Sequence, residues 1–347
     1  MEYRPLGRTG LTVSALSLGT MTFGEQNSQD EAFAQLDMAR DAGINFIDAA
    51  ELYPISPKAE TQGRTEEIIG NWLKSRGRPD DWVIATKVVG PSPAMPWFRG
   101  PDHSLGRADI EAAVDASLRR LGVEAIDLYY LHWPARQTNT FGRLGYTPGD
   151  DADAVPLADS LAVLGELVRA GKIRHVALSN ETPWGLMTAL KLAEQSGLPR
   201  PACIQNPYSL VNRSFEVGLA EIACREAVGL AAYSPLAGGV LSGKYLDGGQ
   251  PPGARLTLWP GRYGRYTKPA GVAATRDYVG LARRHGLDPC AMALAYVMSR
   301  PFVTSAIAGA TSTDQLAGHL AACELTLPEE VLAGIEDIQS LNSNPCP

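Results

Sequence analysis

The sequence has little that would suit the chain to a membrane or to nucleic acid. No stretch approaches the roughly 18 consecutive apolar residues of a membrane-spanning helix, and the densest apolar run, Cys290–Met298, has nine residues. Basic residues are outnumbered, since 31 Lys and Arg stand against 38 Asp and Glu and give a formal net charge of −7. We therefore expect neither a membrane nor a nucleic acid among its partners.

Paired cysteines and metal-ligand spacings are also lacking. None of the five cysteines is spaced as CxxC, and the N-terminal segment has no apolar run of signal-peptide length. An odd number of dispersed cysteines favours reduced thiols, so we expect a cytoplasmic protein. The five histidines show no HxH or HExxH spacing, so we expect no metal site.

What the sequence does contain is a regular alternation of short apolar runs and amphipathic stretches. Apolar residues make up 45% and charged residues 20% of the 347 residues, which excludes a disordered chain. Strict alternation of strands and helices implies parallel strands. We therefore predict an α/β fold, a (β/α)8 TIM barrel preceded by a β-hairpin, as a single domain over residues 1–347. An open doubly wound sheet is the alternative, but a GxGxxG turn is expected after its first strand, and none is present.

The predicted elements follow from the apolar runs and the glycines that end them. The hairpin is predicted within Tyr3–Leu18, around the turn Gly7–Gly10. The barrel strands are predicted at Ala15–Leu18, Ile44–Ile47, Val83–Thr86, Asp127–Leu131, Ile173–Leu178, Cys203–Gln205, Gly229–Ala232 and Val303–Ala308. The helices are predicted at Glu31–Ala42, Arg64–Lys74, Ala108–Leu121, Ser160–Ala170, Pro183–Gln195, Ser214–Ala227, Ala273–His285, Pro289–Ser299, Thr313–Leu320 and Pro328–Ile338.

Three long segments rich in proline and glycine interrupt this alternation, and each follows a predicted strand. They span Val88–Arg107, Trp133–Ala158 and Ala237–Ala270. In a barrel, the segments after the strands lie on the C-terminal face, where active sites are built. Loops of this length usually carry function, so we predict that the functional site lies among them.

Four polar residues near the ends of three neighbouring strands form a chemically coherent set. Asp48 and Lys87 directly follow predicted strands, Tyr53 comes five residues after Asp48, and His132 follows the next strand. A nearby Lys ammonium is expected to lower the pKa of a Tyr phenol, a carboxylate can hold the Lys, and a His can orient a carbonyl oxygen. The set therefore predicts protonation of an oxygen that is becoming an alkoxide.

A cationic segment near the end of the chain predicts a phosphate site. Residues 251–270 contain Arg255, Arg262, Arg265 and Lys268 and no acidic residue, although the chain as a whole is acidic. Such a loop over the mouth of a barrel would suit a pyrophosphate and a 2′-phosphate.

Several motifs resemble the aldo-keto reductase superfamily. They include Asp48–Tyr53, the strand that ends in Lys87, the strand that ends in His132, and Ile173–Asn180. Further segments resemble the bacterial Tas-type NADP(H)-dependent branch of that superfamily: Gly19–Asn27, Glu60–Gly63, Gln205–Leu210 and Asn212–Glu216. The likeness runs from the hairpin to about Asp337.

The resemblance implies a (β/α)8 barrel that binds NADPH across its C-terminal face and passes hydride to an aldehyde or ketone. It implies that Tyr53 is the general acid, Lys87 its activator, Asp48 the partner of Lys87, and His132 the group that orients the carbonyl. Together with Arg255, the expected cofactor-binding residues are Gly19, Thr20, Met21, Asp48, Ser179, Asn180, Gln205, Tyr233, Ser234, Pro235, Leu236, Lys244, Gly309, Thr311 and Gln315. The sequence departs from the family pattern at Gly318 and His319, so the strength of its preference for NADP over NAD is left open. Our hypothesis is that Arg255 carries the 2′-phosphate instead.

The substrate is expected to be a small carbonyl compound. Trp97, Phe98, Trp133, Phe141 and Tyr146 fall in the first two long loops, and an aromatic wall suits an apolar or aromatic substrate. Two other functions remain open: a non-catalytic, cofactor-sensing subunit like the related channel β proteins, and an enzyme that uses Lys87 as a Schiff-base nucleophile. An oligomer is possible, and the sequence does not specify one.

Overall fold

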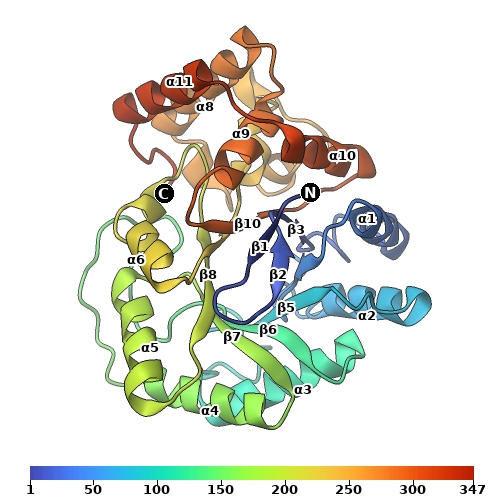
Figure 1. Cartoon of the computed structure of the whole chain (residues 1–347), viewed down its shortest axis with the longest axis vertical. Coiled ribbons are helices and arrows are strands. Elements are labelled where there is room, and N and C mark those ends of the chain that lie inside the picture. The colour runs from blue at the N-terminus through green and yellow to red at the C-terminus, as the bar shows by residue number, and fades with distance from the viewer.

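The computed structural model describes residues 1–347 and contains a closed barrel of eight parallel strands in the order β10-β3-β4-β5-β6-β7-β8-β9 (Figure 1). This confirms the predicted (β/α)8 fold. The barrel strands are β3 (Leu16–Gly19), β4 (Phe46–Asp48), β5 (Val83–Val88), β6 (Ile126–Leu131), β7 (Ile173–Ser179), β8 (Pro201–Pro207), β9 (Leu230–Tyr233) and β10 (Val303–Ala308). The predicted strands differ from these by at most two residues at either end.

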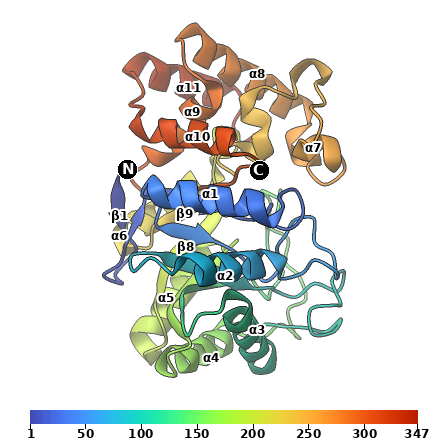
Figure 2. The same cartoon turned by 90° about the vertical axis from the view of Figure 1, so that its right-hand side faces the viewer.

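Helices surround the barrel. They are α1 (Gln29–Asp41), α2 (Arg64–Arg76), α3 (Arg107–Leu121), α4 (Leu157–Arg169), α5 (Pro183–Ser196), α6 (Leu219–Glu226), α7 (Arg255–Leu258), α8 (Pro269–Arg284), α9 (Pro289–Met298), α10 (Thr313–Ala321) and α11 (Glu329–Leu341). Figure 2 shows α8 to α11 gathered at one end of the view, with α3, α4 and α5 at the other. No helix is both long enough and apolar enough to cross a membrane.

The predicted N-terminal hairpin is present and covers the amino end of the barrel (Figure 1). Its strands β1 (Tyr3–Pro5) and β2 (Thr12–Ser14) pair antiparallel. Leu6 and Val13 are fully buried and pack with the inward-facing side chains of the strands. The Arg4 guanidinium donates to the carbonyl of Val303 at the start of β10, 2.8 Å away. The hairpin thus closes the floor of the barrel and leaves the carboxyl ends of the strands open.

Local signals explain why the helices begin and end where they do. Ser28 accepts from the backbone N–H of Glu31, and the Glu31 carboxylate accepts from Ser28 in return, which forms a capping box for α1. Asp288 caps α9, whose first residue is Pro289. Gly122 ends α3 with φ at +65°, a left-handed conformation that glycine adopts at little cost.

Two stretches differ from the prediction. The helix expected over Ser214–Ala227 is broken into a 3₁₀ turn at Ser214–Glu216 and the helix α6, because Gly218 between them has φ at +98°. The long segment Ala237–Ala270, expected as a loop, contains the four-residue α7, the first two residues of α8 and 3₁₀ turns at Ala237–Ser242, Leu246–Gly248 and Gly264–Tyr266.

The strand register brings the predicted catalytic positions to the same rim of the barrel. Asp48 of β4 pairs with Ala85 of β5, and Val88 of β5 pairs with Leu131 of β6. Lys87 pairs with Tyr130, two residues before His132, so Lys87 and His132 both lie at the carboxyl ends of adjacent strands, and Lys87 contacts Asp48 of the strand on its other side. The site is built on this rim.

Candidate functional site

A cleft of about 1100 Å³ lies at the carboxyl ends of the barrel strands. Every residue expected to bind the cofactor lines this cleft: Gly19, Thr20, Met21, Asp48, Ser179, Asn180, Gln205, Tyr233, Ser234, Pro235, Leu236, Lys244, Arg255, Gly309, Thr311 and Gln315. Tyr53 and His132 line it as well. These residues come from positions 19 to 315 of the sequence, and the fold brings them together in one cleft.

Lys87 is fully buried beneath the floor of the cleft, where its charge is paired. Its Nζ lies 2.9 and 2.8 Å from the two carboxylate oxygens of Asp48 and 2.6 Å from the carbonyl oxygen of Ala49. These three acceptors match the three donors of an ammonium group. Burial lowers the pKa of Lys87, and the Asp48 carboxylate opposes that change. Because the nitrogen is fully engaged, this arrangement argues against Lys87 as a Schiff-base nucleophile.

Tyr53 lies on the turn that follows β4, partly exposed to the cleft. The Lys87 Nζ is 4.9 Å from the centroid of its ring. We expected Lys87 to lower the pKa of Tyr53, but the structure contradicts this: burial raises that pKa well above its usual range, and the charge of Asp48 adds to the increase. The main reason is burial, because the protein around the phenol disfavours a charged phenolate, and the negative charge of Asp48 acts in the same direction.

His132 adjoins Tyr53 across the cleft, with the two rings edge to face and their centroids 6.1 Å apart. Burial and the nearby Lys87 ammonium hold the pKa of His132 well below its usual range, so the imidazole is neutral at pH 7. Its Nδ1 is buried without a hydrogen-bond partner. The ring therefore has an unused polar atom beside a cleft.

A chain of hydrogen bonds connects the β7, β8 and β9 side of the cleft to Asp48. Gln205 Nε2 donates to Asp48 Oδ1 at 2.7 Å, and Ser179 Oγ donates to the Gln205 carbonyl at 2.9 Å. Asn180 Nδ2 donates to Ser179 Oγ at 3.1 Å, and the Tyr233 hydroxyl donates to Asn180 Oδ1 at 2.7 Å. The polar wall of the cleft is thus one connected network.

Glycines let the backbone approach closely where the barrel closes between β3 and β10. A Cβ on Gly309 would lie 2.9 Å from the carbonyl oxygen of Gly19, and a Cβ on Gly19 would lie 3.0 Å from the Ile307 side chain. Next to them, Thr20 Oγ1 donates to the Asp48 carbonyl at 2.7 Å. Any larger residue at either glycine would separate the two strand ends that form this part of the wall.

The far end of the cleft is basic and fits an extended phosphate ligand. It is lined by Lys244, Arg255, Arg262 and Arg265. Lys268, the remaining basic residue of the 251–270 segment, does not line it. Gly239 has φ at +90°, and a Cβ there would lie 3.2 Å from Lys244 Cε and Nζ, so the bare backbone leaves room for the lysine. A cation set beside a glycine turn is suited to pyrophosphate.

The last part of the cleft is formed by the turn before α10. Gln315 Oε1 accepts from the Thr311 backbone N–H at 3.0 Å and from its hydroxyl at 3.2 Å. His319 lines the same end, and burial lowers its pKa to about 4. Its Nδ1 and the Oε1 of Gln26 are buried without partners. This end of the cleft thus has two buried polar atoms that the protein itself leaves without partners.

Some lining residues were not predicted from the sequence. Cys290 lines the cleft from the start of α9, a helix that the sequence did not connect with the site. Ser242 lines it as well and falls in the long segment Ala237–Ala270, although it was not singled out there. Gln26 also lines it and donates to the Gly253 carbonyl at 3.0 Å, which links the segment after β3 to the basic loop. Gln26 falls inside the Gly19–Asn27 motif, so a signal for it was present.

The expected aromatic wall is only partly correct. Trp133 and Phe141 line the cleft, with Met95 beside them. The other three aromatic residues do not line it. Phe98 is 2% exposed and packs in a small apolar cluster, Trp97 packs against that cluster, and Tyr146 is 62% exposed.

Comparison with known proteins agrees with this geometry. The sequence pattern described as "Aldo/keto reductase family" matches residues 15–340. The chain is 51% identical to "Protein tas" of Escherichia coli (strain K12) over 347 residues, 100% of each chain. It is 33% identical to "Uncharacterized oxidoreductase YrpG" of Bacillus subtilis (strain 168) over 341 residues, 97% of this chain and 96% of that protein. It is 31% identical to "Probable voltage-gated potassium channel subunit beta" of Oryza sativa subsp. japonica over 354 residues, again 97% and 96%. The chain belongs to the aldo/keto reductase family, whose members are oxidoreductases that act on small molecules with a nicotinamide cofactor.

Proposed function

We propose that this protein is an NADPH-dependent carbonyl reductase that converts aldehydes and ketones to alcohols. The observation that carries the proposal is the meeting of Asp48, Tyr53, Lys87 and His132 at the carboxyl ends of three adjacent strands, beside a large cleft. Its volume of about 1100 Å³ is enough for a dinucleotide together with a small substrate. The whole chain would act as one unit, because lining residues come from β3 through α10.

Tyr53 would be the general acid. When bound, NADPH would supply the hydride, and the residues of this chain would supply the proton and the geometry. Because its pKa is raised, Tyr53 is fully protonated at neutral pH. An alkoxide is a stronger base than a phenolate, so the phenol can give its proton to the carbonyl oxygen as that oxygen becomes negative.

Lys87 and His132 would assist Tyr53 in different ways. The Lys87 ammonium is fixed by Asp48, and at 4.9 Å from the Tyr53 ring it would stabilise the negative charge left on the phenol. A neutral His132 can donate one N–H to the carbonyl oxygen without competing as an acid. Geometry and charge would thus be set before the substrate arrives.

The cofactor would lie along the lined cleft in one direction. Ser179, Asn180, Gln205 and Tyr233 surround the end next to Asp48 and would hold the nicotinamide end. The remaining positions would hold the phosphates and the adenosine, namely Gly19, Thr20, Met21, Ser234, Pro235, Leu236, Lys244, Arg255, Gly309, Thr311 and Gln315. We also propose a cytoplasmic location, which the five unpaired cysteines support.

The test is the oxidation of NADPH in the presence of 4-nitrobenzaldehyde by the wild type and by Tyr53→Phe. We expect the wild type to turn over and Tyr53→Phe to lose at least about tenfold in kcat, equivalent to roughly 1.4 kcal/mol of barrier. Tyr146→Phe is the matched control, because Tyr146 is exposed and lies outside the cleft. An unchanged kcat in Tyr53→Phe would remove Tyr53 from the mechanism.

A cofactor-sensing subunit without turnover is the second candidate. The observation that favours it is the 31% identity to a protein named as a potassium channel subunit beta. The same assay separates the two functions, because a sensing subunit would bind NADPH and reduce no carbonyl compound. The complete set of four polar residues at the cleft favours the reductase.

A further inference from the structure

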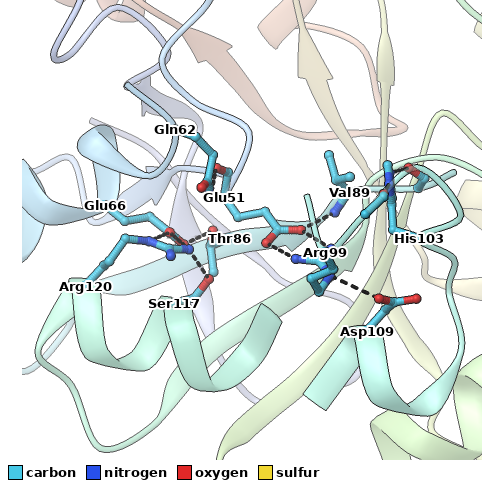
Figure 3. Close-up of polar contacts among 12 residues, drawn as sticks. Glu51, Gln62, Glu66, Thr86, Val89, Arg99, His103, Asp109, Ser117 and Arg120 are labelled. Carbon is cyan, nitrogen blue, oxygen red and sulfur yellow. Dashed lines mark hydrogen bonds and ion pairs between the residues drawn. The ribbon is translucent and has the colours of Figure 1, made fainter. Parts of the chain in front are cut away.

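Two buried carboxylates lie close to β5, outside the residues that line the cleft, and each pairs with one arginine (Figure 3). The Glu51 side chain is 1% exposed and its nearest oxygen lies 2.8 Å from Arg99; the Glu66 side chain is fully buried and lies 2.6 Å from Arg120. Glu51 belongs to the turn between Asp48 and Tyr53, which we call the Tyr53 turn (residues 49–53). Glu66 belongs to α2.

Glu51 anchors the Tyr53 turn to the strand that carries Lys87. Its Oε1 accepts from the backbone N–H of Val89 at 2.8 Å, and its own backbone N–H donates to the Lys87 carbonyl at 3.3 Å. The Arg99 guanidinium adds two parallel hydrogen bonds, at 2.8 and 2.9 Å. Bidentate pairs of this kind fix orientation as well as distance.

Arg99 is itself held in a demanding conformation. Its φ is +64°, in the left-handed region that residues with a Cβ rarely adopt. Its Nε lies 3.4 Å from the Asp109 carboxylate on α3, and its side chain is 19% exposed. Backbone of this kind persists only where the surroundings determine it, and such positions gather at functional sites.

The segment that carries Arg99 also forms one side of the cleft. Residues 89–106 connect β5 to α3, and Pro91, Ser92 and Met95 within them line the cleft. Phe98, the neighbour of Arg99, is 2% exposed and belongs to the same apolar cluster as Leu52 of the Tyr53 turn. An ion pair and an apolar cluster therefore hold this segment and the turn together.

We propose that Arg99 is a positioning residue that acts through Glu51 to fix the turn on which Tyr53 sits. The wall of the substrate cleft and the proton donor are thereby held as one unit. The inference rests on the proposed role of Tyr53 as the acid. Misplacement of a reacting group by about 1 Å can cost on the order of a hundredfold in rate, so loss of this anchor should lower the rate of the chemical step rather than cofactor binding.

The experiment compares two substitutions of the same type. Arg99→Met removes the guanidinium and keeps an apolar stem. Arg78→Met is the matched control, since Arg78 pairs with the buried Asp127 at the amino end of the barrel, and the two side chains are 26% and 2% exposed. For each variant we would measure kcat with saturating NADPH and 4-nitrobenzaldehyde, the Kd for NADPH, and amide hydrogen exchange over residues 49–63.

For Arg99→Met we expect at least about a tenfold loss of kcat, a Kd for NADPH within twofold of the wild type, and faster exchange over residues 49–63. For Arg78→Met we expect kcat and exchange over those residues to stay within twofold of the wild type. If Arg99→Met folds and matches the wild type in kcat and in exchange, the proposal is overturned. It is also overturned if Arg78→Met reproduces both changes, because any lost ion pair would then suffice.

Two further comparisons cover the cases in which Arg99→Met does not fold or Tyr53 is not the acid. If Arg99→Met does not fold, Arg99→Lys keeps the charge, loses the paired hydrogen bonds and is judged by the same three measurements. If Tyr53→Phe retains its kcat, the proposed function has failed at Tyr53. The exchange rates over residues 49–63 still report in that case whether Arg99 holds the turn.

Discussion

Arg255 is the side chain to which we assign the discrimination between NADPH and NADH. It is the first residue of α7, lines the basic end of the cleft, and lies with its guanidinium 5.8 Å from the centroid of the Tyr263 ring. No acidic residue in the 251–270 segment competes for its charge. A guanidinium in this setting is suited to bidentate binding of a phosphate.

We therefore expect Arg255→Ala to weaken NADPH much more than NADH. A hydrogen bond to a charged group contributes about 1.5–3 kcal/mol, so the Kd for NADPH should rise by at least about tenfold, while that for NADH should change by less than about twofold. Fluorescence titration with each cofactor measures both values. Arg225→Ala, on an exposed face of α6, should change neither. Equal loss for both cofactors would contradict the assignment.

The location of the proposed site residues could be predicted from sequence, but their electrostatics could not. Asp48, Tyr53, Lys87 and His132 were found because each lies at or just after a strand end. The direction of the change in the pKa of Tyr53 was predicted wrongly, because it depends on burial and on the negative charge of Asp48. Those quantities are set by packing, to which residues far apart in the chain contribute.

At the scale of elements, glycines determine where helices can run. Gly218 separates the turn at Ser214–Glu216 from α6 with φ at +98°, and a Cβ there would lie 3.4 Å from Pro183. Gly318 lies inside α10, where a Cβ would meet nothing within 4 Å. The first glycine is required by the backbone, whereas the second only adds conformational freedom to the unfolded chain.

The same substitution at these two glycines should therefore have opposite effects. Gly218→Ala should lower the free energy of unfolding by about 1 kcal/mol or more, because a left-handed conformation disfavours a Cβ. Gly318→Ala should raise it by about 0.5–1 kcal/mol. Urea denaturation of both variants measures the two changes, and each variant serves as the control for the other. Changes of the same sign would show that backbone conformation is not the cause.

Elements with strong periodicity could be predicted, and short ones could not. The strand Val303–Ala308 was predicted with its observed ends, because an apolar run there is bounded by a proline and a glycine. The four residues of α7 are too few for a helical pattern to appear. The exposure of Tyr146 and the burial of Phe98 depend on how the long loops fold back, partly through contacts such as Arg99 with Glu51.

At the scale of the whole molecule, the free energy of unfolding should depend on pH through buried histidine. His319 is 5% exposed, and burial lowers its pKa to about 4, from 6.5 when it is free in water. Between these values the unfolded chain holds a proton that the folded protein does not. Stability should therefore fall as the pH falls from about 6.5 to about 4, by up to about 3 kcal/mol from this residue. His132, whose pKa is also lowered, contributes in the same direction.

Urea denaturation of the cofactor-free protein at pH 7 and pH 5 tests this dependence. His319→Gln should lose less stability between the two pH values than the wild type, because glutamine does not titrate. His285→Gln is the matched control, since His285 is exposed on the surface. A wild-type pH dependence in His319→Gln would show that the titrating group lies elsewhere.

The hairpin that covers the amino end of the barrel determines from which end a ligand can reach the cleft. Leu6 and Val13 seal the amino end, so whatever reaches Asp48 enters through the mouth between the long loops. Ligands therefore bind and dissociate through the same opening. A ligand seated deep in the cleft must enter before one that lies above it and can leave only after it. A protein that binds two ligands in such a cleft binds them in a fixed order, and that order follows from the closure of the amino end of the barrel.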